Sequence, residues 1–192
     1  GDTSYNHNYI IEPGDTKYTT RKGEVSSPDH QIVTTELHGT AEFCGICHNE
    51  KSPFGIWVKS TVFELQEGPY YDEGVVCQDC HMPDGPSKTA IMGASYEDAK
   101  MHIFNGAHDP GKVRGTIEIR IAPDIQETVP GEKVVFTITL YNQKTGHKFP
   151  TGSVEDRIAW LHVEAVDDSG NVYHMPVDEK GFEGEEYTIA SE

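Results

Sequence analysis

Two short runs of the sequence pair cysteines with a histidine at the same spacing. We call residues 44–48 the first motif and residues 77–81 the second motif; both read C-x-x-C-H and together they use all 4 cysteines. The residues concerned are Cys44, Cys47, His48, Cys77, Cys80 and His81. C-x-x-C-H is the attachment signal of c-type haem, in which two thiols bond the porphyrin and the histidine is the proximal iron ligand. The sequence therefore predicts two covalently bound haems c, and redox chemistry with them.

Other chemistries of paired cysteines fit this pattern less well. Two C-x-x-C pairs can hold one zinc ion, but the separation between Cys47 and Cys77 is larger than such sites typically have. Zinc also gives no reason for a histidine directly after each second cysteine. A disulfide within C-x-x-C closes a very small loop and stabilises little, and no βαβ pattern of a thioredoxin-like protein surrounds either motif. Zinc and structural disulfides remain the alternatives to haem.

The sixth ligand of each iron separates electron transfer from catalysis. A second histidine gives a low-spin iron without an open site, whereas an open position permits substrate to bind. The chain has 10 histidines and the motifs account for two of them. We rank His102 and His147 first as distal ligands, because each lies in a short loop, then His38 and after it His108. His38 is too close to the first motif to reach across that haem, so it would serve a neighbouring one.

Composition narrows the range of partners. The 192 residues carry a formal net charge of −17, which disfavours nucleic acid and anionic lipid and suits basic redox partner proteins. The mean hydropathy is −0.56, and bound haem would supply apolar mass that the chain itself lacks. The length allows one or two domains.

No apolar stretch is long enough for a membrane span, and no signal peptide is visible at the start of the chain. Because haem is attached to C-x-x-C-H outside the cytoplasm, we expect a processed mature protein in the periplasm or the extracellular space.

Local patterns predict an α+β fold with much irregular structure, divided near residue 112. Residues 1–112 would wrap the haems with short helices, and residues 113–192 would form an antiparallel, immunoglobulin-like β-sandwich. The first expected helix opens at residues 34–38 and runs into the first motif, and two more cover residues 60–65 and 95–102. The expected strands cover residues 16–20, 116–121, 133–141, 158–166 and 172–175, with a hairpin turn at 167–170 and an acidic tail or edge strand at 178–192.

These residues carry a resemblance to a known family. The stretches 42–48 and 74–83 and the later 141–152, which contains Gly-His-Lys-Phe-Pro-Thr-Gly, resemble multihaem cytochromes c of the cytochrome c554-related group. The resemblance covers about residues 36–175. It implies electron transfer in the periplasm or at the cell surface through closely spaced haems, with His147 as a haem ligand in a β-rich part. It also implies a second ligand region at residues 102–106.

The chain departs from that family in having only two motifs, where many relatives carry four or more haems. Surplus histidines would then serve a haem of another subunit, which makes a homo-oligomer or filament a further expectation. The leading interpretation is an electron carrier and not an enzyme. The alternative is a haem enzyme that reduces a small nitrogen-oxide or peroxide substrate at an open iron site, and a third is a structural subunit of an extracellular conductive assembly.

Overall fold

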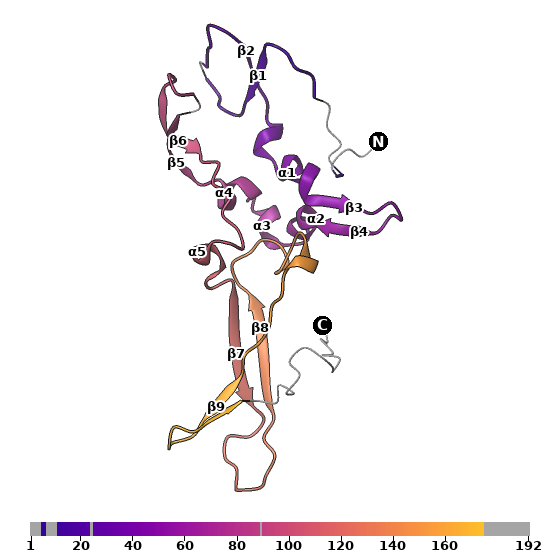
Figure 1. The fold of residues 1–192 in the computed structure, drawn as a ribbon, viewed down its shortest axis with the longest axis vertical. Coiled ribbons are helices and arrows are strands. Elements are labelled where there is room, and N and C mark those ends of the chain that lie inside the picture. The colour runs from indigo at the N-terminus through magenta and orange to yellow at the C-terminus, as the bar shows by residue number, and fades with distance from the viewer. Residues whose placement is uncertain (1–4, 7–10, 24, 89, 175–192) are drawn as a thin grey trace. The chain divides into compact units, whose positions relative to one another are not determined.

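The structure, a computed structural model, describes residues 5–6, 11–23, 25–88 and 90–174 (Figure 1). The chain forms two compact units, residues 1–157 and residues 158–192. The sequence predicts a domain boundary at 112–113 instead, and that boundary stays a prediction. The expected tail at 178–192 and the last residue of the expected strand 172–175 lie outside the described residues.

The described chain is α+β, as the sequence predicts, with short helices and small two-stranded sheets. The helices are η1 Leu37–Gly39, α1 Ala41–His48, α2 Thr61–Gln66, α3 Pro69–Asp72, α4 Cys77–His81, α5 Pro110–Val113 and η2 Val154–Asp156. The strands are β1 Thr16–Thr19, β2 Gln31–Thr34, β3 Asn49–Lys51, β4 Trp57–Ser60, β5 Asp84–Lys88, β6 Ser95–Lys100, β7 Ile117–Pro123, β8 Phe136–Asn142, β9 Glu164–Val166 and β10 Val172–His174.

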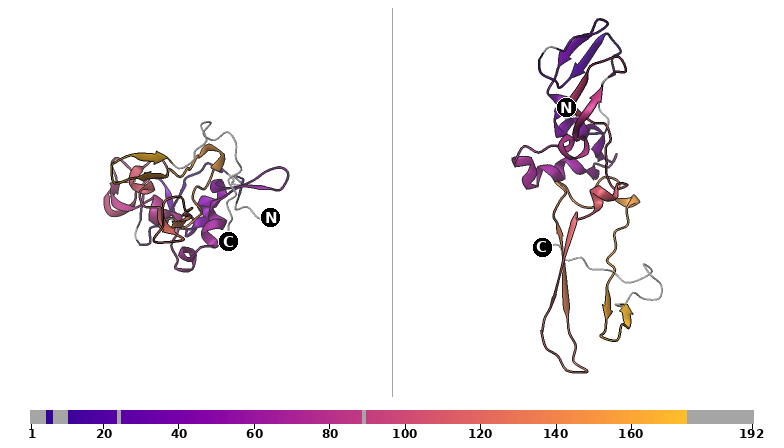
Figure 2. Two further views of the ribbon diagram at one scale, coloured as in Figure 1. Left: turned by 90° about the horizontal axis from the view of Figure 1, so that it is seen from below. Right: turned by 90° about the vertical axis from the view of Figure 1, so that its left-hand side faces the viewer.

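The strands pair only two at a time. β1 and β2 are parallel, whereas β3–β4, β5–β6, β7–β8 and β9–β10 are antiparallel. The β7–β8 hairpin can be followed as a separate two-stranded ribbon in the right view of Figure 2. The described residues therefore form several small sheets. The immunoglobulin-like sandwich stays a prediction.

A small core joins the helices of the first unit. Among the described residues, the buried hydrophobic side chains are Ala41, Val62 and Leu65, one from α1 and two from α2. Tyr70, Val76 and Cys77 pack against them. Because Cys77 opens the second motif, this core links α1, which contains the first motif, to the start of α4, which contains the second.

Asn49 is the largest fully buried side chain and lies directly after the first motif. Its Oδ1 accepts a hydrogen bond of 3.1 Å from the backbone N–H of Val62 in the first turn of α2. The first N–H groups of a helix have no partner inside the helix, so a side chain from elsewhere must satisfy them. Asn49 thereby ties the end of the first motif to α2.

The hairpin β7–β8 leads into the loop that contains His147. Its register pairs Ile119 with Leu140 and Ile117 with Asn142, and β8 begins at Phe136, three residues later than the expected strand. At its base, the ammonium of Lys144 donates to the carbonyls of Gly111, Lys112 and Arg114 at 3.1, 3.2 and 3.2 Å. The hairpin is thus joined to α5, whose last carbonyl groups would otherwise lack partners.

The second unit contains the β9–β10 hairpin. Asp167–Gly170 forms the turn that the sequence predicts, and the backbone N–H of Gly170 donates to the carbonyl of Asp167 at 2.9 Å. The expected strand at 158–166 is shorter than predicted, because only Glu164–Val166 is strand.

The helix expected at residues 95–102 is wrong. Residues 95–100 form β6, which pairs antiparallel with β5 in a register that places Gly85 opposite Ala99. A run that begins with serine and acidic residues is typical of a helix start, but a partner strand 11 residues earlier supplies the hydrogen bonds instead. The helix expected at 60–65 is confirmed as α2. The helix expected to open at 34–38 and run into the first motif begins later: β2 ends at Thr34, the single turn of η1 follows, and α1 contains the first motif.

Candidate functional site

The first motif lies entirely within α1. On a helix, residues three and four positions apart share one face, so Cys44, Cys47 and His48 point to the same side of α1. Glu42, in the first turn, accepts hydrogen bonds from Gln66 of α2 and Tyr71 of α3. The helix that carries the first motif is therefore held against α2 and α3.

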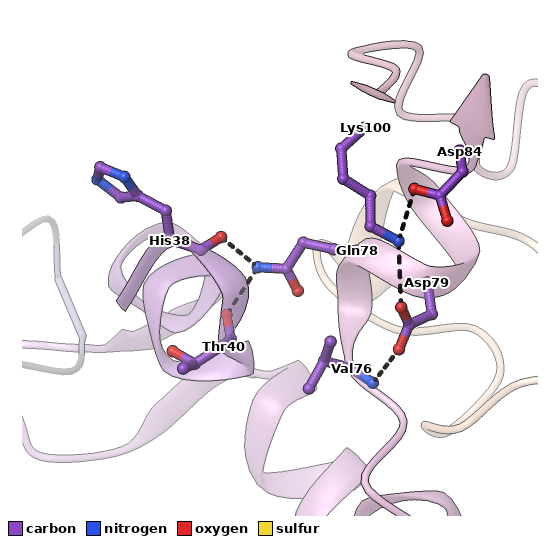
Figure 3. A network of polar contacts seen from close by, with 7 residues as sticks. All are labelled: His38, Thr40, Val76, Gln78, Asp79, Asp84 and Lys100. Carbon is purple, nitrogen blue, oxygen red and sulfur yellow. Dashed lines mark hydrogen bonds and ion pairs between the residues drawn. The ribbon is translucent and has the colours of Figure 1, made fainter. Parts of the chain in front are cut away.

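The second motif forms the whole of α4, so its cysteines and histidine have the same spacing on one helical face. Asp79 closes the helix start, because its Oδ2 accepts a hydrogen bond of 3.0 Å from the backbone N–H of Val76 (Figure 3). Its other oxygen lies 3.3 Å from the ammonium of Lys100, which also pairs with Asp84. Lys112 donates to the carbonyl of Cys80.

A buried glutamine joins the two motifs. Gln78 is 4% exposed, and its Nε2 donates to the carbonyls of His38 and Thr40 at 2.9 and 2.8 Å (Figure 3). Carbonyls only accept, so the orientation of the amide is determined. Its Oε1 is buried without a partner among the described residues. Gln78 therefore fastens α4 to the segment that immediately precedes α1.

The first cysteine of each motif contacts the other. The thiol of Cys77 donates to Cys44, which lowers the pKa of Cys44. The same shared proton raises the pKa of Cys77 above its usual range, and burial acts in the same direction. All four cysteines are free thiols; Cys44 and Cys77 are half-buried, while Cys47 and Cys80 are exposed. The first cysteines of the two motifs thus lie side by side.

His48 lies near the same cluster. Although its side chain is exposed, partial desolvation lowers its pKa, and the positive fields of His81, Lys59 and His147 act in the same direction. A lowered pKa favours the neutral imidazole, which is the form that binds a metal.

The loop after β8 has little freedom around His147. A Cβ on Gly146 would lie 2.8 Å from Leu65 Cδ1 and 3.3 Å from Tyr70 Cδ2, so only glycine allows this close approach to α2 and α3. Asn142 Nδ2 and Thr145 Oγ1 both donate to the carbonyl of His147, at 2.7 and 2.6 Å. The loop is therefore held both internally and against the helices.

His81 and His147 face each other as near-parallel rings. Their ring centres are 6.4 Å apart and their planes differ by 15°. The Nδ1 of His81 bonds the carbonyl of Asn105 at 2.6 Å, and the Nδ1 of His147 bonds the carbonyl of Lys148 at 2.8 Å. Since a carbonyl accepts, each Nδ1 carries the proton in the neutral ring and each Nε2 keeps its lone pair.

The spacing of these two rings would allow His81 and His147 to hold one haem iron between them. Metal–imidazole bonds of about 2 Å, with about 1 Å more from each nitrogen to its ring centre, place two ring centres about 6 Å apart across a metal. Metal-ligating histidines usually donate their other N–H to a carbonyl or carboxylate, which fixes the ligating nitrogen. The residues present therefore fit a haem that is attached through Cys77 and Cys80 and ligated by His81 and His147.

Three other candidate ligands remain; His108 is exposed, and its role as a ligand stays a prediction. His38 and His102 have described ring contacts. The ring of His38 lies against Phe43 and Tyr18, with ring centres 4.6 and 6.3 Å away. The ring of His102 is exposed and stacks on Phe104 at 5.8 Å. Neither makes a described contact with His48 or His81, and their roles as ligands stay predictions.

Several residues that position the site have no signal in the sequence. Asn105 acts through its carbonyl, which any residue could supply. Gln78 occupies a motif position where residue type is free, and Glu64 of α2, which contacts the His147 loop, resembles any helix-surface acid. Only their contacts in the folded chain reveal them.

Comparison with known proteins finds no matching family model, no matching curated protein and no matching solved structure. Among the described residues, no three His, Cys, Asp or Glu side chains gather into a metal-ion site. A haem iron takes at most two ligands from the chain, because the porphyrin supplies the other four, so a haem does not require such a group of three. In the same part of the chain, no helix has both the length and the apolar run that a membrane crossing needs.

Proposed function

We propose that this protein is a dihaem c-type cytochrome that carries electrons outside the cytoplasm. The observation that carries the proposal is the pair His81 and His147, with ring centres 6.4 Å apart and planes within 15°. Both Nδ1 atoms are committed to backbone carbonyls. Combined with two C-x-x-C-H helices, this geometry favours an iron with histidine on both faces over an open site.

Bound haem would supply one-electron redox chemistry at its iron. The chain's own residues would determine where that chemistry takes place. Cys44 and Cys47 would anchor one haem with His48 as its proximal ligand, and the second motif would anchor the other. The contact between Cys44 and Cys77 would keep the two attachment points adjacent, as electron exchange between cofactors requires.

A small protein core supports the same proposal. Among the described residues only three hydrophobic side chains are buried, whereas Phe54, Ile91 and Met92 are at least 90% exposed. A chain of 192 residues normally buries most of its apolar side chains to offset the entropy of folding. Two porphyrins would add apolar surface against which α1 and α4 could pack.

The test is production of the chain together with a c-type haem attachment system. We expect a mass increase of two haems and a low-spin spectrum for the haem of the second motif. Replacing both cysteines of either motif by alanine should remove one haem. A chain that binds zinc or forms disulfides in place of haem would overturn the proposal.

His147→Ala tests the ligand assignment directly. We expect one haem to become high spin and to bind cyanide, because the sixth position opens. The same substitution at His102 and at His38 provides matched comparisons, which also test whether either residue ligates a haem. An unchanged spectrum of the His147 variant would contradict its assignment as a ligand.

The same experiments address the enzymatic alternative, in which the first motif's haem has an open site for a nitrogen oxide or peroxide. Among the described contacts, His81 has an imidazole partner and His48 has none. Cyanide binding to the wild-type protein, with turnover of such a substrate, would favour the enzyme.

We further propose periplasmic or extracellular placement, basic redox partner proteins and, for residues 113–192, an immunoglobulin-like sandwich. A repeating array of subunits would use surplus histidines such as His38. Electron microscopy of the purified protein would reveal filaments, and a monomer whose own chain ligates both haems fully would contradict the array.

A further inference from the structure

His147 is an unusual candidate ligand because it lies in a loop and not in a helix with the motif. An imidazole on a loop ligates well only when neighbouring groups hold the backbone in place. The carbonyl of Lys148 accepts from the His147 Nδ1, so the orientation of the ring depends on the backbone of Lys148.

Glu64 of α2 is the side chain that holds this part of the loop. Its Oε2 accepts from the backbone N–H of Lys148 at 3.2 Å and from Thr151 Oγ1 at 2.7 Å. Its Oε1 accepts from Ser60 Oγ at 3.0 Å. One half-buried carboxylate thus joins α2 to both sides of the tip of the loop.

A second contact supports the same segment. Thr61 Oγ1 lies 2.9 Å from Thr151 Oγ1, so the first turn of α2 meets the loop through Thr61 and Glu64 together. Because Val62 and Leu65 of α2 belong to the buried core, the helix that carries Glu64 is itself firmly placed. Glu64 holds the N–H of Lys148 and the His147 ring binds the C=O of Lys148, so the backbone of Lys148 connects α2 to the ring.

We propose that Glu64 is the positioning residue that holds His147 at the iron of the haem attached to the second motif. This inference rests on the proposed function and adds a residue that does not touch the cofactor. It predicts that the hydrogen bonds of Glu64, and not its charge, determine whether His147 occupies the sixth coordination position of that iron.

The test compares Glu64→Leu with Glu64→Gln in the haem-loaded protein. Leucine removes all three accepted hydrogen bonds. Glutamine keeps them, because its Oε1 can accept from Lys148 and Thr151 while its Nε2 donates to Ser60. We expect the leucine variant to show a high-spin population at one haem, cyanide binding and a higher midpoint potential. The glutamine variant should keep the wild-type spectrum.

Glu67→Leu is the matched control. Glu67 directly follows α2 and contacts the same loop residue, but through the exposed side chain of Lys148 at 3.8 Å and not through the backbone. This variant should remain low spin. High-spin haem in Glu67→Leu to the same degree as in Glu64→Leu would overturn the inference, as would a Glu64→Gln spectrum that matches the leucine variant.

Thr151→Val provides the test if Glu64→Leu does not fold. It removes one donor to Glu64 from the loop side and leaves α2 unchanged, so partial high-spin character is expected with an unaltered far-ultraviolet circular dichroism spectrum. A fully low-spin spectrum would overturn the inference. Different results would contradict the proposed function: absence of haem, or a spectrum of the His147→Ala variant that equals that of the wild type.

Discussion

At the scale of single residues, the site depends on close contacts that allow little change. Gly146 shows this most clearly, because its backbone passes against Leu65 and Tyr70. His147, the candidate ligand next to it, is held by hydrogen bonds to backbone atoms, which tolerate sequence change only while the loop keeps its path.

Gly146→Ala should displace the His147 loop. A Cβ at 2.8 Å from Leu65 Cδ1 forces either the loop or α2 to move, at a cost of about 1–3 kcal/mol. We expect a lower free energy of unfolding and a high-spin fraction at one haem, measured by denaturation and by visible absorption. Gly14→Ala, where no atom lies within 4 Å of the added Cβ, is the control. Equal behaviour of the two variants would contradict the close approach.

Leu65→Ala should be among the most destabilising changes of a single apolar residue. Leu65 is 6% exposed and belongs to the small core between α1 and α2, so its truncation should cost about 2–4 kcal/mol. Leu140→Ala, at a leucine that is 53% exposed, should cost much less. Urea unfolding of the haem-loaded variants measures both, and comparable losses would show that the core is not where the structure places it.

At the scale of elements, the two helices that contain the C-x-x-C-H motifs are joined by side chains and not by a common sheet. Gln78 connects α4 to the segment before α1, and Cys77 packs on the core to which α1 contributes Ala41. The spacing of the two motifs therefore depends on a few specific contacts.

Gln78→Leu should weaken the connection between the motifs. The change leaves the carbonyls of His38 and Thr40 without the donor that they have in the wild type. Loss of buried hydrogen-bond partners costs about 1–3 kcal/mol. The matched change Gln66→Leu removes only an exposed hydrogen bond of 3.4 Å and should have little effect. Chemical denaturation compares the two, and an equally stable Gln78 variant would argue against this connection.

At the scale of the whole molecule, charge should govern association. With a net charge of −17, the protein should attract a basic redox partner from a distance and lose that advantage as salt screens the field.

We expect the rate constant for electron transfer to a small basic cytochrome to fall as ionic strength rises from low salt to physiological salt, measured by stopped-flow absorption. Transfer to a neutral small-molecule acceptor is the control and should change little. A rate to the basic partner that does not depend on salt would exclude electrostatic steering.

Elements with strong local patterns could be predicted from the sequence, and those decided by a distant partner could not. The alternating strand at 116–121, the turn at 167–170 and the helix at 60–65 carry their own signals and are present. The segment 95–100 has the local features of a helix start, yet pairing with β5 makes it a strand. Backbone hydrogen bonds to a partner strand outweighed a weak local preference.

The candidate site divides in the same way. The sequence by itself determined the two C-x-x-C-H motifs and their predicted cofactor, because the residues that define each motif are neighbours in the sequence. It left four histidines as candidate distal ligands. Only the tertiary structure brought His147 opposite His81 and revealed Glu64, Gln78 and the carbonyl of Asn105 as their supports. A distal ligand is defined by a position in space, which depends on how a loop 66 residues away in the sequence packs against α2 and α3.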